Sequence, residues 1–141
     1  ENPLYPLLQT VANLNIDMIG RLDPKRKDKD PKYIYLIGSD KLSQELHDIS
    51  EAANQKYTQL KLDYTFNADD DPNRFYYRSD HYNFAKNNIP VIFYFNGTHE
   101  DYHRPSDTPD KINYPLLQKR TQLIFYTLWE LANRAERIQL K

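Results

Sequence analysis

NIPVIFYF, residues 88–95, contains the most apolar run of the chain. Val91 to Phe95 is uninterrupted by any charged side chain, and Pro90 stands immediately before it. A short apolar run of this length, bounded by residues that break regular structure, is typical of a buried strand. We therefore predict a central strand at residues 91–95.

Three other segments indicate how the rest of the sheet and its connections are arranged. Residues 11–18 and 60–66 alternate apolar and polar side chains with the period of two that a strand requires. Residues 33–37 form a continuous apolar run ended by Gly38, typical of a strand covered on both faces. Residues 21–32 are charged and contain two prolines, and we predict a surface loop there.

Helical patterns lie between and after these strands. The first predicted helix covers residues 40–56, with Ser39 or Asp40 as its cap, and a short second helix is capped by Ser79. A long third helix opens at Asn113. Strands that alternate with helices predict an α/β fold, with a mainly parallel sheet covered by helices.

Composition excludes several classes of function. The 141 residues fit one domain or a piece of one. The net charge of -1, from 19 basic and 20 acidic residues, gives no reason to expect a nucleic acid or an anionic membrane as partner. No apolar stretch approaches the roughly 20 residues of a membrane span. The absence of cysteine excludes disulfides and cysteine-based zinc sites.

Residues 96–111 are predicted to form a long loop that carries two of the four histidines. Connections of this length are usually functional. The string His99-Glu100-Asp101-Tyr102-His103 matches H-E-x-x-H, a zinc-protease motif that works only on a helix. Gly97 and Pro105 flank the string, so we predict loop at residues 98–104 and interpret the match as chance.

Three blocks of sequence resemble the family twenty-eight metallopeptidases, which are co-catalytic zinc exopeptidases of the aminopeptidase type. They are NIDMIGR at residues 15–21, RSDHY at 78–82 leading to NIPV at 88–91, and YHRPSDT at 102–108. Together they occur in the family's order and span nearly the whole chain. The resemblance implies that residues 1–141 form the C-terminal part of a single catalytic domain with the zinc-exopeptidase-like (phosphorylase/hydrolase-like) fold.

The same resemblance implies roles for individual residues. Asp17 would bind one Zn²⁺ ion and His103 the other, with bonds of about 2.0–2.2 Å. Tyr76, or its neighbour Tyr77, would donate a hydrogen bond to the oxyanion. The remaining positions assigned to the loop or the substrate pocket are Asp80, Arg104, Ser106 and Asp107.

The family's site also needs residues that this chain lacks upstream of Asp17. They are a histidine, an aspartate that bridges both metals, and an adjacent pair of glutamates, whereas residues 1–16 contain one acid, Glu1, and no histidine. We therefore predict that the chain is a fragment of a longer hydrolase, inactive without the N-terminal half of its domain. Because the chain starts at Glu1 and not at Met, we also expect sequence upstream.

In that parent enzyme the resemblance implies hydrolysis of the N-terminal peptide bond of a peptide substrate, by water that two zinc ions acidify and a glutamate deprotonates. Two alternatives stay open. One is a non-catalytic binding or scaffold domain of the same fold, and the other is a single-zinc acyltransferase of the glutaminyl cyclase kind. Because relatives are often exported, we expect a periplasmic or secreted location.

Overall fold

The computed structural model, which describes residues 3–141, is built on a mixed four-stranded sheet. The strands are β1 (Asn13–Ile16), β2 (Tyr33–Ile37), β3 (Lys61–Asp63) and β4 (Val91–Phe95), and they lie in the order β1-β4-β2-β3. β4 pairs in parallel with β1 and antiparallel with β2, while β2 pairs in parallel with β3. The predicted α/β class and the central position of β4 are confirmed.

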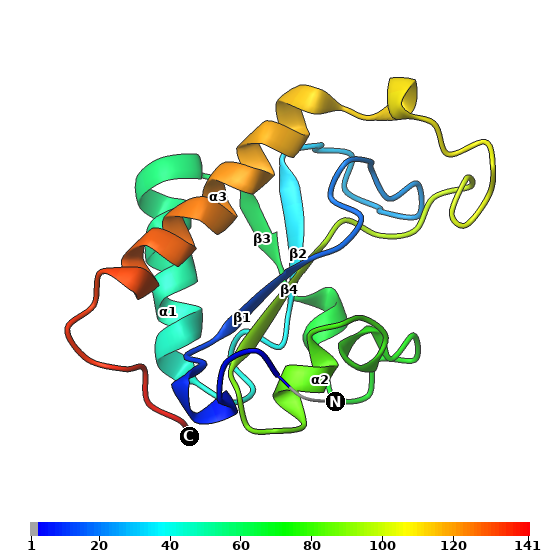
Figure 1. Cartoon of the computed structure of the whole chain (residues 1–141). Helices are drawn as coiled ribbons and strands as arrows, with labels where there is room; N and C mark the ends of the chain where they lie inside the picture. The colour runs from blue at the N-terminus through cyan, green and yellow to red at the C-terminus, as the bar shows by residue number, and fades with distance from the viewer. Residues whose placement is uncertain (1–2) are drawn as a thin grey trace.

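The two faces of the sheet are covered by different kinds of structure. α1 (Gln44–Ala53) and α3 (Tyr114–Ala132) lie side by side on one face, while α2 (Tyr82–Ala85) and short turns cover the other (Figure 1). The single-turn elements are η1 (Leu7–Gln9), η2 (Asn54–Thr58), η3 (Thr65–Asn67), η4 (Phe75–Tyr77) and η5 (Pro109–Lys111).

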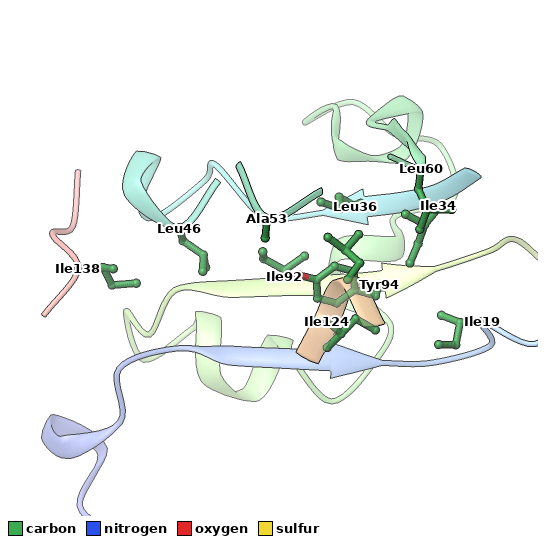
Figure 2. Close-up of a cluster of buried hydrophobic side chains, with 11 residues drawn as sticks. Ile19, Ile34, Leu36, Leu46, Ala53, Leu60, Ile92, Tyr94, Ile124 and Ile138 are labelled. Atoms are coloured by element: carbon green, nitrogen blue, oxygen red, sulfur yellow. The ribbon is translucent and has the colours of Figure 1, made fainter. Parts of the chain in front are cut away.

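Alternation along β2 and β4 explains both layers, because successive side chains of a strand point to opposite faces. Every residue of these two strands is buried. Figure 2 shows the α1–α3 face, where Ile92 and Tyr94 of β4 meet Leu46, Ala53 and Ile124 from the helices. The opposite face is aromatic, and its buried members are Tyr33, Tyr35, Ile37, Phe75, Phe93 and Phe95. A central strand buried on both faces accounts for the unbroken apolar run.

The start of α1 differs from the prediction. Ser43 is the cap, and its hydroxyl accepts a hydrogen bond from the Leu46 amide at 3.3 Å. The predicted caps Ser39 and Asp40 are wrong, because the chain first makes a turn at Gly38, whose carbonyl accepts the Lys41 amide at 3.2 Å. Gly38 has a φ of 86°, and this turn delays the helix by several residues.

Strand β3 is also shorter than the predicted segment 60–66. The carboxylate of Asp63 accepts hydrogen bonds from the amide and the hydroxyl of Thr65, at 2.9 and 2.6 Å. This local side-chain capture of the backbone ends the ladder and begins η3. Phe66, predicted as a strand residue, instead packs in the aromatic cluster against Tyr35.

The long C-terminal helix is confirmed, with Asn113 as its cap and Pro115 in its first turn. The side chain of Asn113 accepts a hydrogen bond from the Leu116 amide at 3.2 Å. The buried residues of α3 include Arg120, Leu123 and Ile124. Within residues 3–141, no helix combines the length and the apolarity that crossing a bilayer requires.

Candidate functional site

Asp17 continues β1 for one residue beyond its last paired position. Its amide donates to the carbonyl of Tyr94 at 3.2 Å, and its exposed side chain stands where the strand ends. The Ser79 hydroxyl donates to Asp17 Oδ2 at 2.9 Å and itself accepts from the Asn15 amide group at 3.0 Å. The carboxylate of Asp17 is therefore oriented by a two-step hydrogen-bond chain.

This chain replaces the capping role predicted for Ser79. Helix α2 begins after His81 without a side-chain cap, because the Ser79 hydroxyl is engaged with Asp17 and Asn15. The partners lie 62 and 64 residues away in the sequence. The prediction that Ser79 caps this helix is therefore wrong. The local sequence around Ser79 could not show this, because it does not distinguish a helix cap from a contact with distant residues.

His103 lies in a turn of the loop that leaves β4. The amide of Arg104 donates to the Asp101 carbonyl at 2.9 Å, which closes a turn with Tyr102 and His103 at its centre. His103 is exposed and has a φ of 57°, and the ring of Tyr102 stacks on it at 3.9 Å between centroids. A left-handed backbone in a residue other than glycine is strained, and such residues cluster at functional sites.

The left-handed conformation also occurs beside Asp17, at Met18, where φ is 60°. Both candidate ligands are thus at, or next to, a residue held in an unfavourable backbone conformation. Each such residue costs of order 1–3 kcal/mol and persists only where its surroundings determine it. Those surroundings are the contacts of Asp17 with Ser79 and the ion pairs of the His103 loop.

The helical zinc-protease motif is excluded. Residues 98–104 are turns and irregular backbone, as predicted, so His99 and His103 do not share a helix face. Their environments also differ, since the His99 side chain is only 6% exposed and its Nε2 lies 3.8 Å from Asp107. His103 alone is accessible to a ligand.

Ion pairs join this loop to the segment that follows Asp17. Arg21 donates from its two terminal nitrogens to Asp101 and Asp107, each at 3.0 Å, and Lys111 donates to Asp101 at 2.8 Å. The Lys111 ammonium, the Ser106 hydroxyl and the Arg21 guanidinium hold the pKa of Asp101 well below its usual range. The two loops, 17–32 and 96–111, therefore lie side by side beyond the sheet (Figure 1).

The predicted loop residues differ in what they contact. Asp107 takes part in the pairing with Arg21, and Ser106 lies beside the Asp101 carboxylate. Arg104 is exposed and contributes its backbone to the turn, with its carbonyl accepting the Asp107 amide at 3.1 Å. Asp107 and Ser106 thus make side-chain contacts with Arg21 and Asp101, whereas Arg104 contributes backbone hydrogen bonds.

The two candidate tyrosines have different surroundings. The ring of Tyr76 packs on Gly38, level with the start of β4. At about 3.3 Å per strand residue, this is roughly 10 Å back along the sheet from Asp17. Burial raises the pKa of Tyr76 to about 12, so its hydroxyl stays protonated at neutral pH. Tyr77 is 45% exposed, and its ring meets the edge of Tyr82.

Asp80 and His81 are placed away from the loop. Asp80 is exposed and lines a surface hollow with Pro3, Leu7 and Asn83 near the N-terminal segment. His81 is fully buried, stacks on Phe93 at 4.6 Å, and its Nε2 lies 2.6 Å from the Tyr76 carbonyl. Burial lowers the pKa of His81, so it is a neutral packing residue.

A cavity of about 530 Å³ opens on the aromatic face beside the start of the His103 loop. Tyr35, Phe66 and Phe75 line it, and Gly97 and Thr98 form the side that continues into the loop. Its rim is charged, with contributions from Lys25, Arg26 and Asp63. Most of its lining residues are charged or polar, whereas small-ligand pockets are lined mainly by apolar side chains.

Asp17 and His103 supply the donor types that Zn²⁺ takes in proteins, a carboxylate oxygen and an imidazole nitrogen. The Asp17 side chain is exposed at the carboxyl end of β1, and the His103 side chain is exposed in the loop that leaves the neighbouring parallel strand β4. Residues 3–141 contain no group of three or more histidine, aspartate or glutamate side chains placed to hold a metal ion. The chain therefore fits part of a zinc site and does not complete one.

The Ser79 contact leads to a testable expectation. Ser79→Ala removes the donor to Asp17 Oδ2 and leaves the exposed carboxylate free to rotate. Loss of a hydrogen bond to a metal ligand typically costs 10–100-fold in metal affinity. In the full-length natural protein we expect about 10-fold weaker zinc binding, measured by competition with a chromogenic chelator. Thr121→Ala, which removes an exposed hydroxyl that bonds within α3, is the control, and equal affinities for both variants would contradict the orienting role.

Comparisons with known proteins give one family match and one structural match. A model of Peptidase family M28 matches residues 1–128. Among solved structures, the LapA aminopeptidase of Legionella pneumophila superposes with a TM-score of 0.66 and 22% sequence identity. The superposition covers 89% of this chain and 32% of that chain, so this chain spans about a third of the enzyme's length. No curated protein sequence matches. At this identity the structural likeness shows the fold.

Proposed function

We propose, from the premise that this chain belongs to peptidase family M28, that it contributes Asp17 and His103 to the two-zinc centre of an aminopeptidase. The observation that carries the proposal is that Arg21 joins the segment after Asp17, at the end of β1, to the loop that carries His103 and leaves the parallel strand β4. Donor type, exposure and backbone strain at the two positions support it.

We further propose that the chain is the C-terminal part of one catalytic domain. Within residues 3–141, β1 is an edge strand paired only with β4, and Ile16 at its end is 50% exposed. An unpaired strand edge presents free backbone groups that another strand can satisfy. The remaining metal ligands and the general base would come from the N-terminal half of the domain, which would also supply a strand to pair with β1.

In the proposed reaction each residue of this chain has a limited task. When bound, the zinc ions would acidify a water molecule and polarise the carbonyl of the N-terminal peptide bond. Asp17, oriented by Ser79, and His103, held in its strained turn, would each hold one ion. A protonated tyrosine, Tyr76 or Tyr77, would donate to the oxyanion, which for Tyr76 requires the ring to leave its place on Gly38.

The proposal is tested on the full-length natural protein with aminoacyl nitroanilides. We expect hydrolysis of substrates with a free amino group, loss of that activity on dialysis against a zinc chelator, and recovery when Zn²⁺ is added back. The present chain alone should show no turnover, because its ligand set is incomplete. Equal cleavage of amino-blocked substrates, or activity insensitive to the chelator, would contradict an aminopeptidase.

The same assay separates the alternatives. A non-catalytic domain of this fold would bind without turnover in every arm. An acyltransferase of the glutaminyl cyclase kind would release ammonia from peptides with N-terminal glutamine and bind one zinc ion per molecule. Periplasmic or secreted location is proposed on the family likeness, and fractionation of the source cells tests it.

A further inference from the structure

Arg21 links the segment that follows Asp17 to the loop that carries His103. It follows Asp17 by four residues, and its guanidinium reaches across to the loop that carries His103. One terminal nitrogen donates to Asp101 and the other to Asp107, both at 3.0 Å. The Arg21 side chain is 19% exposed and that of Asp101 is 7% exposed, so the Arg21–Asp101 contact is largely shielded from solvent, whereas the Asp107 side chain is 41% exposed.

The two carboxylates lie on either side of His103 in the sequence and in the turn. The backbone carbonyl of Asp101 closes the turn around His103 by accepting the Arg104 amide, and the Asp107 amide donates to the Arg104 carbonyl. A guanidinium that holds both acids therefore fixes the turn at its start and just beyond its end. His103, with its left-handed backbone, lies between these two fixed points.

The backbone of Arg21 is itself held firmly. Arg120 donates to the carbonyls of Ile19 and Arg21, at 2.7 and 3.1 Å, and the Asn113 amide donates to the Gly20 carbonyl at 2.9 Å. Asp17, at the other end of this short segment, is held by β4. A continuous set of polar contacts thus connects the two candidate ligands.

We propose that Arg21 is a positioning residue that sets the place of His103 relative to Asp17, and with it the separation of the two zinc positions. The inference rests on the proposed function. Two metal ions that act on one water need a separation of about 3.5–4 Å. A displacement of 1 Å in a reacting group can cost 100-fold in rate. A rigid link between the two segments that hold the ions meets that requirement.

The planar guanidinium is essential to this role, because it presents two donors in a fixed fork. A lysine ammonium at the same position is a point charge that reaches one carboxylate at a time. Without Arg21, Asp101 keeps its contact with Lys111, whereas Asp107 keeps only the distant His99. The downstream side of the His103 turn is the part expected to loosen.

The test compares Arg21→Met with Arg134→Met in the full-length natural protein. Arg134, which follows the end of α3, also pairs with one carboxylate, that of Glu45 in α1, at 3.2 Å. For Arg21→Met we expect about 10-fold weaker zinc binding or more in chelator competition. We also expect a kcat at least about 10-fold lower, with KM within about twofold of wild type. Arg134→Met should keep the zinc affinity and kcat of the wild type.

Arg21→Lys guards against a folding defect. This variant should melt at the wild-type temperature. It should nevertheless bind zinc more weakly than the wild type and have a lower kcat, a combination that a general loss of stability would not produce. Amide hydrogen exchange at Arg104 and Asp107 should also accelerate in both Arg21 variants. Wild-type zinc affinity and kcat in Arg21→Lys and Arg21→Met would overturn the inference and leave the proposed function intact. A wild-type protein that binds no zinc would overturn both.

Discussion

Replacing Arg120 by methionine should lower the free energy of unfolding by about 3 kcal/mol, because it leaves several buried carbonyls without donors. The Arg120 side chain is completely buried and donates to four backbone carbonyls, those of Ile19, Arg21, Pro31 and Tyr33. Methionine is an unbranched, uncharged side chain that approximates the aliphatic part of arginine and supplies no hydrogen-bond donor. Chemical denaturation followed by circular dichroism measures the loss.

The sign of this effect depends on two opposing terms. Burial of the guanidinium is unfavourable and lowers the pKa of Arg120 to about 10. The hydrogen bonds from the guanidinium to the four carbonyls offset this cost. When the guanidinium is removed, the buried carbonyls are left without donors, so the protein is destabilised. Arg134→Met, which breaks a partly exposed pair with Glu45, should cost under about 1 kcal/mol. Similar losses for both variants would show that the Arg120 network contributes little.

Arg120 also shows where sequence reasoning reached its limit. A charged residue in an amphipathic helix is expected on the solvated face. Three of its four partners come from the loop before β2 and the fourth, Tyr33, begins β2, at sequence separations of 87 to 101 residues. No local pattern encodes such contacts, so the sequence correctly predicted α3 and missed the residue that attaches it to the site. Arg21 was missed for the same reason, since its partners lie 80 and 86 residues away.

The elements that were predicted correctly depend on periodicity alone. Both faces of β2 and β4 are buried, so their unbroken apolar runs identified them directly. The reversed direction of β2 relative to β4 was not predictable, because strand direction depends on how connections cross the sheet. Capping residues were predicted with less success, since Ser39, Ser43 and Ser79 have the same capping chemistry and only their tertiary partners distinguish them.

The candidate site was predicted from motifs rather than from physics. The order of the three sequence blocks pointed to Asp17 and His103. The structure places Asp17 at the end of β1 and His103 in the loop that leaves β4, and the parallel pairing of these strands brings their carboxyl ends to one edge of the sheet. The separation between their side chains depends on the loop, and motifs carry no information on it.

Substitution of either candidate ligand should have the largest effect on activity. In the full-length natural protein, Asp17→Asn and His103→Ala should each lower kcat/KM by at least about 1,000-fold. Asparagine keeps the size of Asp17 and can still accept from Ser79, so that the change removes charge with little change in shape. Zinc content, measured by atomic absorption, should fall by about one ion per molecule in each variant, since each side chain would hold one ion.

Two controls make this result specific. Asp48→Asn and His47→Ala remove the same chemical groups from α1, and neither should change zinc content or kcat/KM. Because Asp17 and His103 would act on one reacting centre, the double variant should be no slower than the slower single variant, as for residues that act as a unit. Multiplicative losses in the double variant would mean that the two residues act separately. Retention of two zinc ions by both single variants would show that residues other than Asp17 and His103 hold the metals.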